Sequence, residues 1–194
     1  ETERVTVNNA LVEKMLGPVK FKPDSISKAD LVGVVNGLAW TSVGGELLQV
    51  EALVMDGSGK LELTGSLGDV MKESAKAAHS YIRSIAEKFG IDDEIFKKKD
   101  IHIHVPQGAV PKDGPSAGVT ISTAILSALT QIKVKQSVAM TGEITLTGRV
   151  LPIGGLREKA MAAYKNHILR VIIPKENESD LFEVDPVDKE NVEF

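Results

Sequence analysis

An uncharged stretch over residues 114–132 constrains the fold more than any other feature of this sequence. Lys112-Asp113 comes directly before it and Lys133 directly after it, so charged side chains border the stretch without entering it. A helix with no charged face is either buried in a protein core or spans a membrane. Serine and threonine recur along the stretch, and the rest of the chain is rich in charged residues. We therefore predict a central helix packed on all sides in a soluble domain, with no membrane partner.

The stretch opens with Gly114-Pro115-Ser116-Ala117-Gly118, which places a serine where a loop becomes a helix. The first turn of a helix has unpaired backbone N–H groups and the positive end of the helix dipole. Such an environment stabilises an alkoxide or a developing oxyanion. Ser116 is therefore the candidate nucleophile of an acyl-transfer reaction.

The composition excludes several classes of protein. The chain has 194 residues, 42% of them apolar, and a formal net charge of −4, which suit one domain and argue against a partner made of nucleic acid. Cysteine is absent, which excludes a disulfide framework, a thiolate nucleophile and zinc held by cysteine. The charged first residues are followed by no apolar segment, so we expect no signal peptide.

Strand-like and helical patterns alternate from residue 30 onward. Hairpins are predicted at Asp56-Gly57-Ser58-Gly59 and around Thr147-Gly148. Apolar spacing predicts helices over 69–89 and 156–166. Further strands are predicted over 31–35, 38–41, 101–105, 138–140 and 169–173, the last of them buried. This mixed order indicates an α/β (α+β) fold with mixed sheets and packed helices.

Residues 1–29 have a different character from the rest of the chain. An amphipathic helix is predicted over 7–16, closed by Gly17-Pro18, and the polar residues 20–28 resemble a linker. We expect residues 1–29 to be the tail of a preceding domain and residues 30–194 to form the domain proper.

A serine hydroxyl needs a base before it can act as a nucleophile. Gly114-x-Ser116-x-Gly118 matches the nucleophile elbow of α/β-hydrolases, in which His167 would be the base and Glu143 or Glu158 the acid. However, the residues before Ser116 are rich in proline and glycine and do not form the strand that this elbow requires. The chain is also short for that fold, so an esterase of this type is the weaker alternative.

Lys159 is the better candidate for the base. On the helix predicted over 156–166 it shares a face with Leu156, Ala160 and Ala163, whereas Arg157, Glu158, Ala162 and Lys165 point elsewhere. A lysine on an apolar stripe either extends its ammonium group to water or becomes buried with a lowered pKa. In the second case its neutral amine can accept the proton of a serine, as in Ser–Lys variants of the catalytic triad.

Several longer motifs closely resemble the proteolytic domain of the Lon family of ATP-dependent proteases, in its soluble A-type branch. The resemblance covers nearly everything from residue 30 onward and rests on the runs PKDGPSAG at 111–118, MTGEITL at 140–146 and VLPIGGLREK at 150–159, together with GLAWT at 37–41, Gly44-Gly45 and TGSLG at 64–68.

The resemblance implies a fold like the second domain of ribosomal protein S5 and a serine endopeptidase of the endopeptidase La type. It assigns Ser116 as the nucleophile, Lys159 as the general base and then general acid, and Thr141 as the residue that orients the lysine. It further implies homo-hexameric rings that degrade unfolded, damaged and regulatory proteins, in the cytoplasm or, in a eukaryote, in the mitochondrial matrix.

The sequence lacks two parts that the resemblance leads us to expect. No nucleotide-binding motif of the form Gly-x-x-x-x-Gly-Lys-Ser/Thr occurs, so we expect no cofactor in this chain. ATP and Mg²⁺ would bind a missing ATPase module, whose last helix residues 1–20 resemble. The chain also stops at Phe194, where family members continue into a last helix, so a truncated carboxyl end is expected.

Other polar residues near these motifs are weaker candidates. His102 and His104 point to one face of a predicted strand and could neighbour the site, but no further ligands accompany them as a metal site would require. Asp113 could close the nucleophile loop, cap a helix or modulate the dyad. Glu51, an acid within an apolar strand, could neighbour the site or pair with a surface base. We expect Trp40 in the core or at an interface.

A non-catalytic module that keeps this fold for ring assembly remains the alternative to an enzyme.

Overall fold

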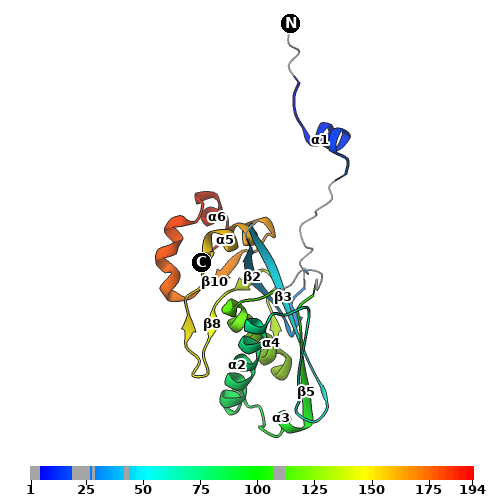
Figure 1. The fold of residues 1–194 in the computed structure, drawn as a ribbon, viewed down its shortest axis with the longest axis vertical. Coiled ribbons are helices and arrows are strands. Elements are labelled where there is room, and N and C mark those ends of the chain that lie inside the picture. Colours follow the sequence, from blue (N-terminus) through cyan, green and yellow to red (C-terminus); the bar gives the residue numbers. More distant parts are fainter. Residues whose placement is uncertain (1–4, 19–26, 28, 42–43, 107–111) are drawn as a thin grey trace.

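The computed structural model describes residues 5–18, 27, 29–41, 44–106 and 112–194. Helix α1 (Asn9–Leu16) confirms the first predicted helix: the side-chain oxygen of Asn8 accepts a hydrogen bond from Leu11 N at 2.9 Å, and Gly17 ends the helix with φ 83°. No residue of α1 is buried, and the helix lies apart from the rest of the molecule (Figure 1). Most of the predicted linker, residues 20–28, lies outside the described residues.

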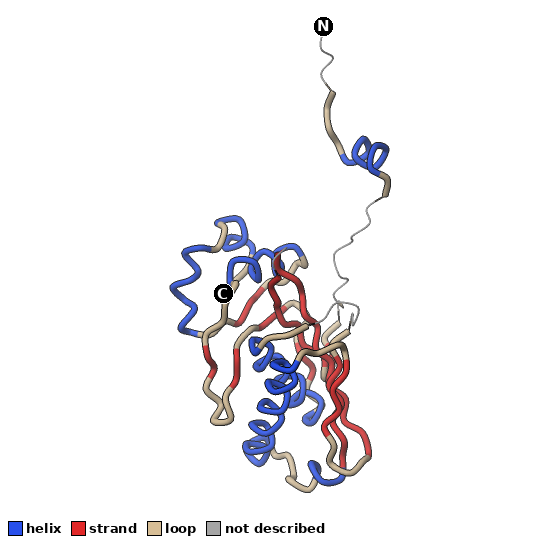
Figure 2. Tube along the Cα trace, in the orientation of Figure 1, coloured by secondary structure: helices blue, strands red, loops and turns tan. Residues whose placement is uncertain are grey.

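A six-stranded mixed sheet forms the centre of the domain, in the order β10-β7-β2-β3-β5-β4. Figure 2 shows its strands gathered beside the paired helices α2 and α4. The mixed α/β class is thus confirmed. The strands of this sheet are β2 (Val34–Thr41), β3 (Gly44–Asp56), β4 (Leu61–Thr64), β5 (Lys99–His104), β7 (Val138–Met140) and β10 (Arg170–Ile172).

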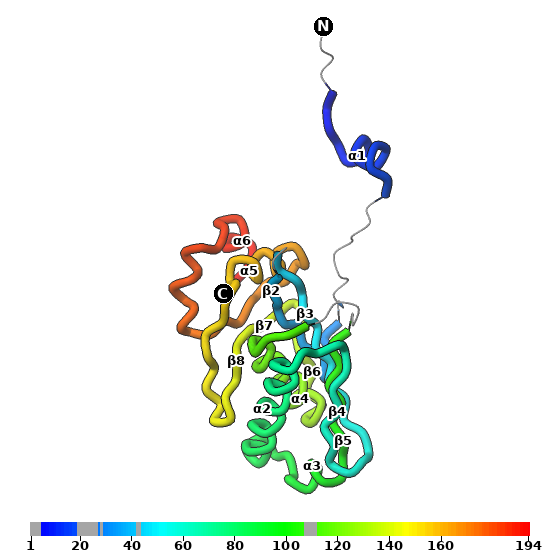
Figure 3. The backbone as a smooth tube through the Cα atoms, viewed as in Figure 1, coloured from blue at the N-terminus to red at the C-terminus, as the bar shows by residue number. Residues whose placement is uncertain are grey.

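The first hairpin prediction was wrong. β3 does not pair with β4; β5 lies between them, antiparallel to β3 and parallel to β4. Figure 3 shows the neighbouring tubes of β4 and β5. The carboxylate of Asp100, on β5, accepts hydrogen bonds from Ser58 N at 2.7 Å and Lys60 N at 2.8 Å. The turn after β3 therefore wraps around the start of β5. A turn of this length can span two strand spacings, and sequence alone did not reveal the strand that fills the gap.

Helices cover both faces of the sheet. On one face α2 (Asp69–Ile85) and α4 (Gly118–Thr130) pack together, and Val35 on β2 joins their apolar cluster. On the other face α5 (Leu156–Lys165) packs on β2 and β3, where Leu38 meets Ala162 and Ala163. Because successive side chains of a strand point to opposite faces, β2 contributes side chains to the apolar clusters on both faces of the sheet.

Helix α4 is the central helix predicted from the uncharged stretch. Ile121, Ala124 and Ile125 are fully buried, and the hydroxyl of Thr120 donates to Met140 O at 3.1 Å. The helix can lie this close to β2 because Gly37 has no side chain there: a Cβ at Gly37 would approach Thr120 Oγ1 to 2.9 Å. The expected burial is confirmed.

Shorter elements complete the domain. They are β1 (Leu31–Val32), η1 (Ala86–Phe89), α3 (Ile95–Lys98), η2 (Pro115–Ala117), β6 (Lys133–Val134), β8 (Glu143–Ile144), β9 (Val150–Leu151), η3 (Lys175–Glu183) and α6 (Pro186–Asn191). β8 and β9 form the second predicted hairpin. The strand predicted over 169–173 exists as β10 but is only partly buried, since Ile172 is 47% exposed. In the part of the chain that the structure describes, no helix has the length and apolar character needed to cross a membrane.

Asp100→Ala is expected to lower the free energy of unfolding measurably, because two backbone N–H groups lose a charged acceptor. Urea unfolding measures this. Asp56→Ala is the matched control: its side chain is 94% exposed and pairs with Lys99 on the same corner of the sheet, so a much smaller change is expected. Equal losses in the two variants would refute the role of Asp100 in holding the turn around β5.

Candidate functional site

Ser116 lies in the short 3-10 turn η2, directly before α4. Gly114 enters the turn with φ 124°, a backbone conformation that favours glycine, and Pro115 fixes the next φ angle. The carbonyl of Ser116 accepts a hydrogen bond from Gly142 N at 2.8 Å, just past the end of β7. The turn that carries Ser116 is therefore attached to the sheet as well as to α4.

Asp113 holds the other side of this turn. One oxygen of its carboxylate accepts hydrogen bonds from Met71 N and Gly114 N, both at 2.9 Å. Met71 lies in the first turn of α2, so Asp113 caps that helix from a distant part of the chain. A side chain at Gly68 would collide with this carboxylate, because a Cβ there would lie 2.3 Å from the Asp113 Cγ. Of the alternatives that the sequence left open, the structure shows loop closure and helix capping.

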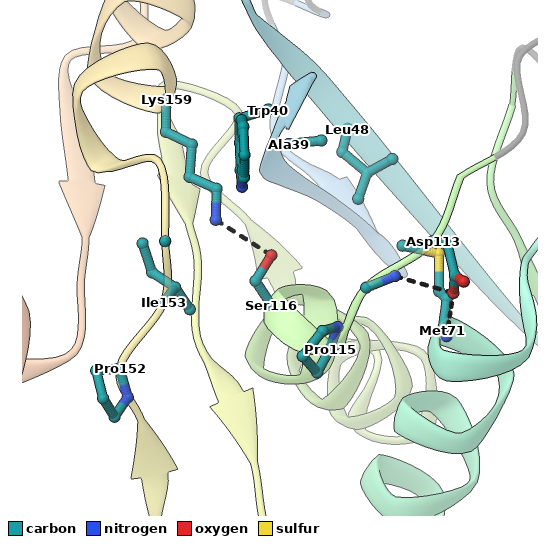
Figure 4. Close-up of a pocket in the computed structure, with 12 residues that line it drawn as sticks. Ala39, Trp40, Leu48, Met71, Asp113, Pro115, Ser116, Pro152, Ile153 and Lys159 are labelled. Carbon is teal, nitrogen blue, oxygen red and sulfur yellow. Dashed lines mark hydrogen bonds between the residues drawn. The ribbon is translucent and has the colours of Figure 1, made fainter. Parts of the chain in front are cut away.

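Lys159 reaches Ser116 from the opposite layer of the domain. It lies in the first half of α5 and is fully buried, and its Nζ is 3.1 Å from Ser116 Oγ (Figure 4). α5 lies unusually close to β3, since a Cβ at Gly45 would be only 1.9 Å from Glu158 O. Burial lowers the pKa of Lys159 to about 8, because the charged ammonium group loses hydration.

Thr141 links the two groups. Its hydroxyl oxygen accepts a hydrogen bond from Lys159 Nζ at 3.0 Å, and its own proton can be donated to Ser116 O at 3.4 Å. Thr141 is 1% exposed and follows the last residue of β7. The structure thus brings Ser116, Lys159 and Thr141 into one hydrogen-bonded group.

A cavity of about 190 Å³ opens over this group. Trp40, Leu48 and Met71 contribute apolar surface, and Pro152 and Ile153 face them across the serine (Figure 4). Trp40 is 54% exposed, which excludes the core as its position, and the alternative expected for it, an interface, stays a prediction. Its indole ring lies against Gly155, where a Cβ would be 2.4 Å from the ring, and this contact requires a glycine.

The remaining candidates lie elsewhere. His102 and His104 both contact the hydroxyl of Thr64, with ring nitrogens 2.8 and 2.7 Å from its oxygen. Glu51 on β3 lies opposite His104 on β5 in the strand register. None of these three lines the cavity. Across the described residues, no group of three or more His, Cys, Asp or Glu side chains could hold a metal ion.

His167 is not at the serine either. It follows the carboxyl end of α5 with φ 57°, at an exposed position, and does not line the cavity over Ser116. The residue that contacts Ser116 is Lys159, so the geometry does not form the Ser–Glu–His arrangement of the esterase alternative.

Leu48, Met71 and Ile153 line the cavity but were not predicted as parts of the site. Leu48 and Met71 look like ordinary core positions, and each is no more than 3% exposed. Only the position of Ile153 within the motif VLPIGGLREK, close to the lysine, offered a signal.

Comparison with known proteins agrees with this geometry. Residues 6–194 match the family described as the Lon protease (S16) C-terminal proteolytic domain. The chain is 61% identical to a Lon protease of Finegoldia magna over 194 residues, which is all of this chain and 25% of that protein. It is 58% identical to a Lon protease of Clostridium acetobutylicum over 190 residues, or 98% of this chain and 24% of the relative. A Lon protease of Aquifex aeolicus is 60% identical over 173 residues, or 89% of this chain and 22% of the relative.

The chain therefore spans about a quarter of the length of these relatives. The family expected from the motifs is confirmed, and with it the class of serine peptidase. The division at residue 29 stays a prediction, as do the roles of the individual site residues. By its match over nearly its whole length, the chain belongs to the family of Lon protease (S16) C-terminal proteolytic domains.

Proposed function

We propose that this domain hydrolyses peptide bonds through a dyad of Ser116 and Lys159, within an ATP-dependent Lon-type protease. The observation that carries the proposal is the buried amine of Lys159, 3.1 Å from a serine hydroxyl that opens into a cavity. A lysine deprived of water is neutral in a substantial fraction of molecules near pH 8, and only the neutral amine can accept a proton.

The reaction starts when the neutral Lys159 amine takes the proton of Ser116 Oγ and the oxygen attacks the carbonyl carbon of the substrate peptide. The resulting ammonium group gives its proton to the nitrogen of the leaving amine as the C–N bond breaks. An acyl-enzyme on Ser116 remains. Water then attacks the ester with Lys159 again as base, and Ser116 recovers its proton when the acid product leaves.

Thr141 orients the lysine in this scheme. Since its oxygen accepts one N–H of Lys159 and its proton points to Ser116 O, the amine lone pair is directed to Ser116 Oγ. The N–H of Ser116 is our candidate for the oxyanion donor. Among the described residues it has no hydrogen-bond partner, whereas Gly114 N is taken by Asp113 and Pro115 has no N–H.

Substrates and partners follow from the family. We propose that the domain receives unfolded or damaged proteins from an ATPase module that binds ATP and Mg²⁺, that it assembles as a homo-hexamer, and that it works in the cytoplasm. Residues 1–29 would connect it to that module. The cavity suits one side chain of an extended chain and not a folded surface, because it is small and bounded by two layers.

An interaction module without catalysis is the competing function. It has no need for a lysine buried against a serine hydroxyl, since an unpaired buried ammonium group destabilises a fold. Replacing the dyad residues separates the two functions.

Ser116→Ala and Lys159→Met are each expected to lower kcat/KM for an unfolded protein and a fluorogenic peptide by about 1,000-fold or more, because either change removes the nucleophile or its base. His167→Ala is the control and is expected to stay within about twofold. The assay is run on the domain and on the full-length protease that contains it. Retained activity in Lys159→Met, or a loss confined to His167→Ala, would refute the dyad.

The pH dependence of cleavage is expected to follow the lysine. Below pH 8 the rate kcat/KM should rise about tenfold for each pH unit, because the neutral fraction of Lys159 rises tenfold, and it should level off above pH 8. Stopped assays with the peptide in buffers from pH 6 to pH 10 measure this. A plateau already reached at pH 6.5 would point to a base other than this lysine.

The free energy of unfolding is also expected to depend on pH through the lowered pKa of Lys159. Between about pH 8 and pH 10.5 the unfolded lysine binds a proton that the folded one has released, so stability rises with pH in that window. Relative to Lys159→Met, the parent should gain about 2 kcal/mol between pH 8 and pH 10. Urea unfolding of both proteins at each pH measures this, and parallel curves would show that the buried lysine has an ordinary pKa.

A further inference from the structure

Asn177 makes a pair of hydrogen bonds that no part of the proposed mechanism uses. It lies in η3 and is 2% exposed. Its side-chain oxygen accepts from Ile153 N at 2.9 Å, and its side-chain nitrogen donates to Ile153 O at 2.8 Å. The amide thus pairs with both backbone groups of one residue, as a neighbouring strand would do.

Asp180 holds that amide in place. The second N–H of the Asn177 side chain donates to Asp180 Oδ2 at 2.6 Å. Both donors of the amide are then satisfied, and its orientation is fixed, because a flipped amide would turn its oxygen to a carboxylate. An amide that is fully bonded in a buried place has little freedom to move.

The backbone to which Asn177 is hydrogen-bonded, at Ile153, lines the cavity and leads into α5, the helix that carries Lys159. Residues 152–154 join β9 to α5, and all three line the cavity over Ser116. Gly154-Gly155 makes this connection intrinsically loose. Within the described part of the chain, no hydrogen bond other than those from Asn177 holds the backbone of residues 152–154.

The segment before Asn177 also supports the other partner of the lysine. Thr141 N donates a hydrogen bond to Ile172 O, at the end of β10, at 3.1 Å. The ring of Pro174 lies close to Gly142, since a Cβ at Gly142 would be 3.6 Å from that ring. Residues 172–177 therefore contact the backbone of Thr141 and that of Ile153, six residues before Lys159.

We infer that Asn177 is a positioning residue of the active site: by clamping Ile153 it fixes the first turn of α5 and so the distance between Lys159 Nζ and Ser116 Oγ. The inference rests on the proposed dyad. A displacement of about 1 Å at a reacting pair can cost a hundredfold in rate, so a residue that touches neither group can still govern the reaction.

The test compares Asn177→Ala with Asn166→Ala in the full-length protease. Asn166 caps the far end of the same helix through a similar side-chain hydrogen bond, to Ala162 O at 2.8 Å. Asn177→Ala is expected to lower kcat about 10- to 100-fold with KM changed less than about threefold. Asn166→Ala is expected to keep kcat within about twofold, even if its melting temperature falls.

A second measurement does not depend on turnover. The ¹³Cε resonance of Lys159 is titrated by NMR in the isolated domain, assigned through its absence in Lys159→Met. In the parent it should titrate near pH 8, and in Asn177→Ala it should titrate at higher pH because the amine gains access to water. Asn166→Ala should match the parent.

The outcomes separate the two proposals. An unchanged kcat and an unchanged titration in Asn177→Ala would overturn the positioning role while the dyad stands. An equal fall of kcat in Asn166→Ala would also overturn it, since the effect would then be one of general stability. A parent without a lysine titrating near pH 8 would sink the dyad and this inference together. If Asn177→Ala does not fold, Asp180→Ala decides, with an expected loss of about 3- to 10-fold in kcat and the same direction of titration shift.

Discussion

The burial of one lysine side chain is the constraint on which the rest of this structure depends. Lys159 is fully buried, and its only polar partners in the described structure are the hydroxyls of Ser116 and Thr141. Neither hydroxyl carries a charge that could stabilise an ammonium ion, so burial lowers the pKa of the amine. Keeping this group charged in the folded state at pH 7 costs about 3 kcal/mol. In the proposed mechanism this cost and the reactivity of the site have one physical origin, because water that would stabilise the ammonium group would also leave less of the neutral amine that acts as the base.

The short length of β7 explains how residues from two layers can meet. α4 and α5 pack on opposite faces of the sheet, and a continuous strand between them would separate Ser116 from Lys159. β7 ends at Met140, and the next two residues turn their polar groups to both layers. Thr141 receives the lysine, while Gly142 N donates to Ser116 O and Gly142 O accepts from Val119 N. The site therefore forms at the carboxyl end of a strand, where the sheet stops dividing the two layers.

The parts that the sequence could predict are those encoded by local patterns. The uncharged stretch predicted α4, and the apolar spacing of Leu156, Ala160 and Ala163 predicted a face of α5 that the structure shows to be buried. That spacing left open whether Lys159 extends to water, and the structure shows it fully buried. The wrong hairpin prediction also came from a local pattern, since Asp56-Gly57-Ser58-Gly59 has the composition of a tight turn. In the structure this turn binds Asp100 of β5, more than forty residues away in the sequence, and β5 is the strand that pairs with β3. The hydrogen bonds of Asp113 with Met71 and of Asn177 with Ile153 likewise join residues that are distant in the sequence, and no periodic pattern predicts them.

These distant contacts share a physical character that suits a reactive site. Asp113 and Asn177 each satisfy backbone groups of loop residues, one beside Ser116 and the other before Lys159. Loops rich in glycine and proline have no regular hydrogen bonding of their own, and apolar packing tolerates small shifts more readily than a hydrogen bond of fixed direction does. Since a neutral amine must stay within hydrogen-bond distance of one hydroxyl, directional contacts at both loops fix its geometry better than additional apolar contacts would. Positioning thus accounts for the polar side chains around the proposed dyad, and the apolar clusters on both faces of the sheet supply the stability that the buried lysine removes.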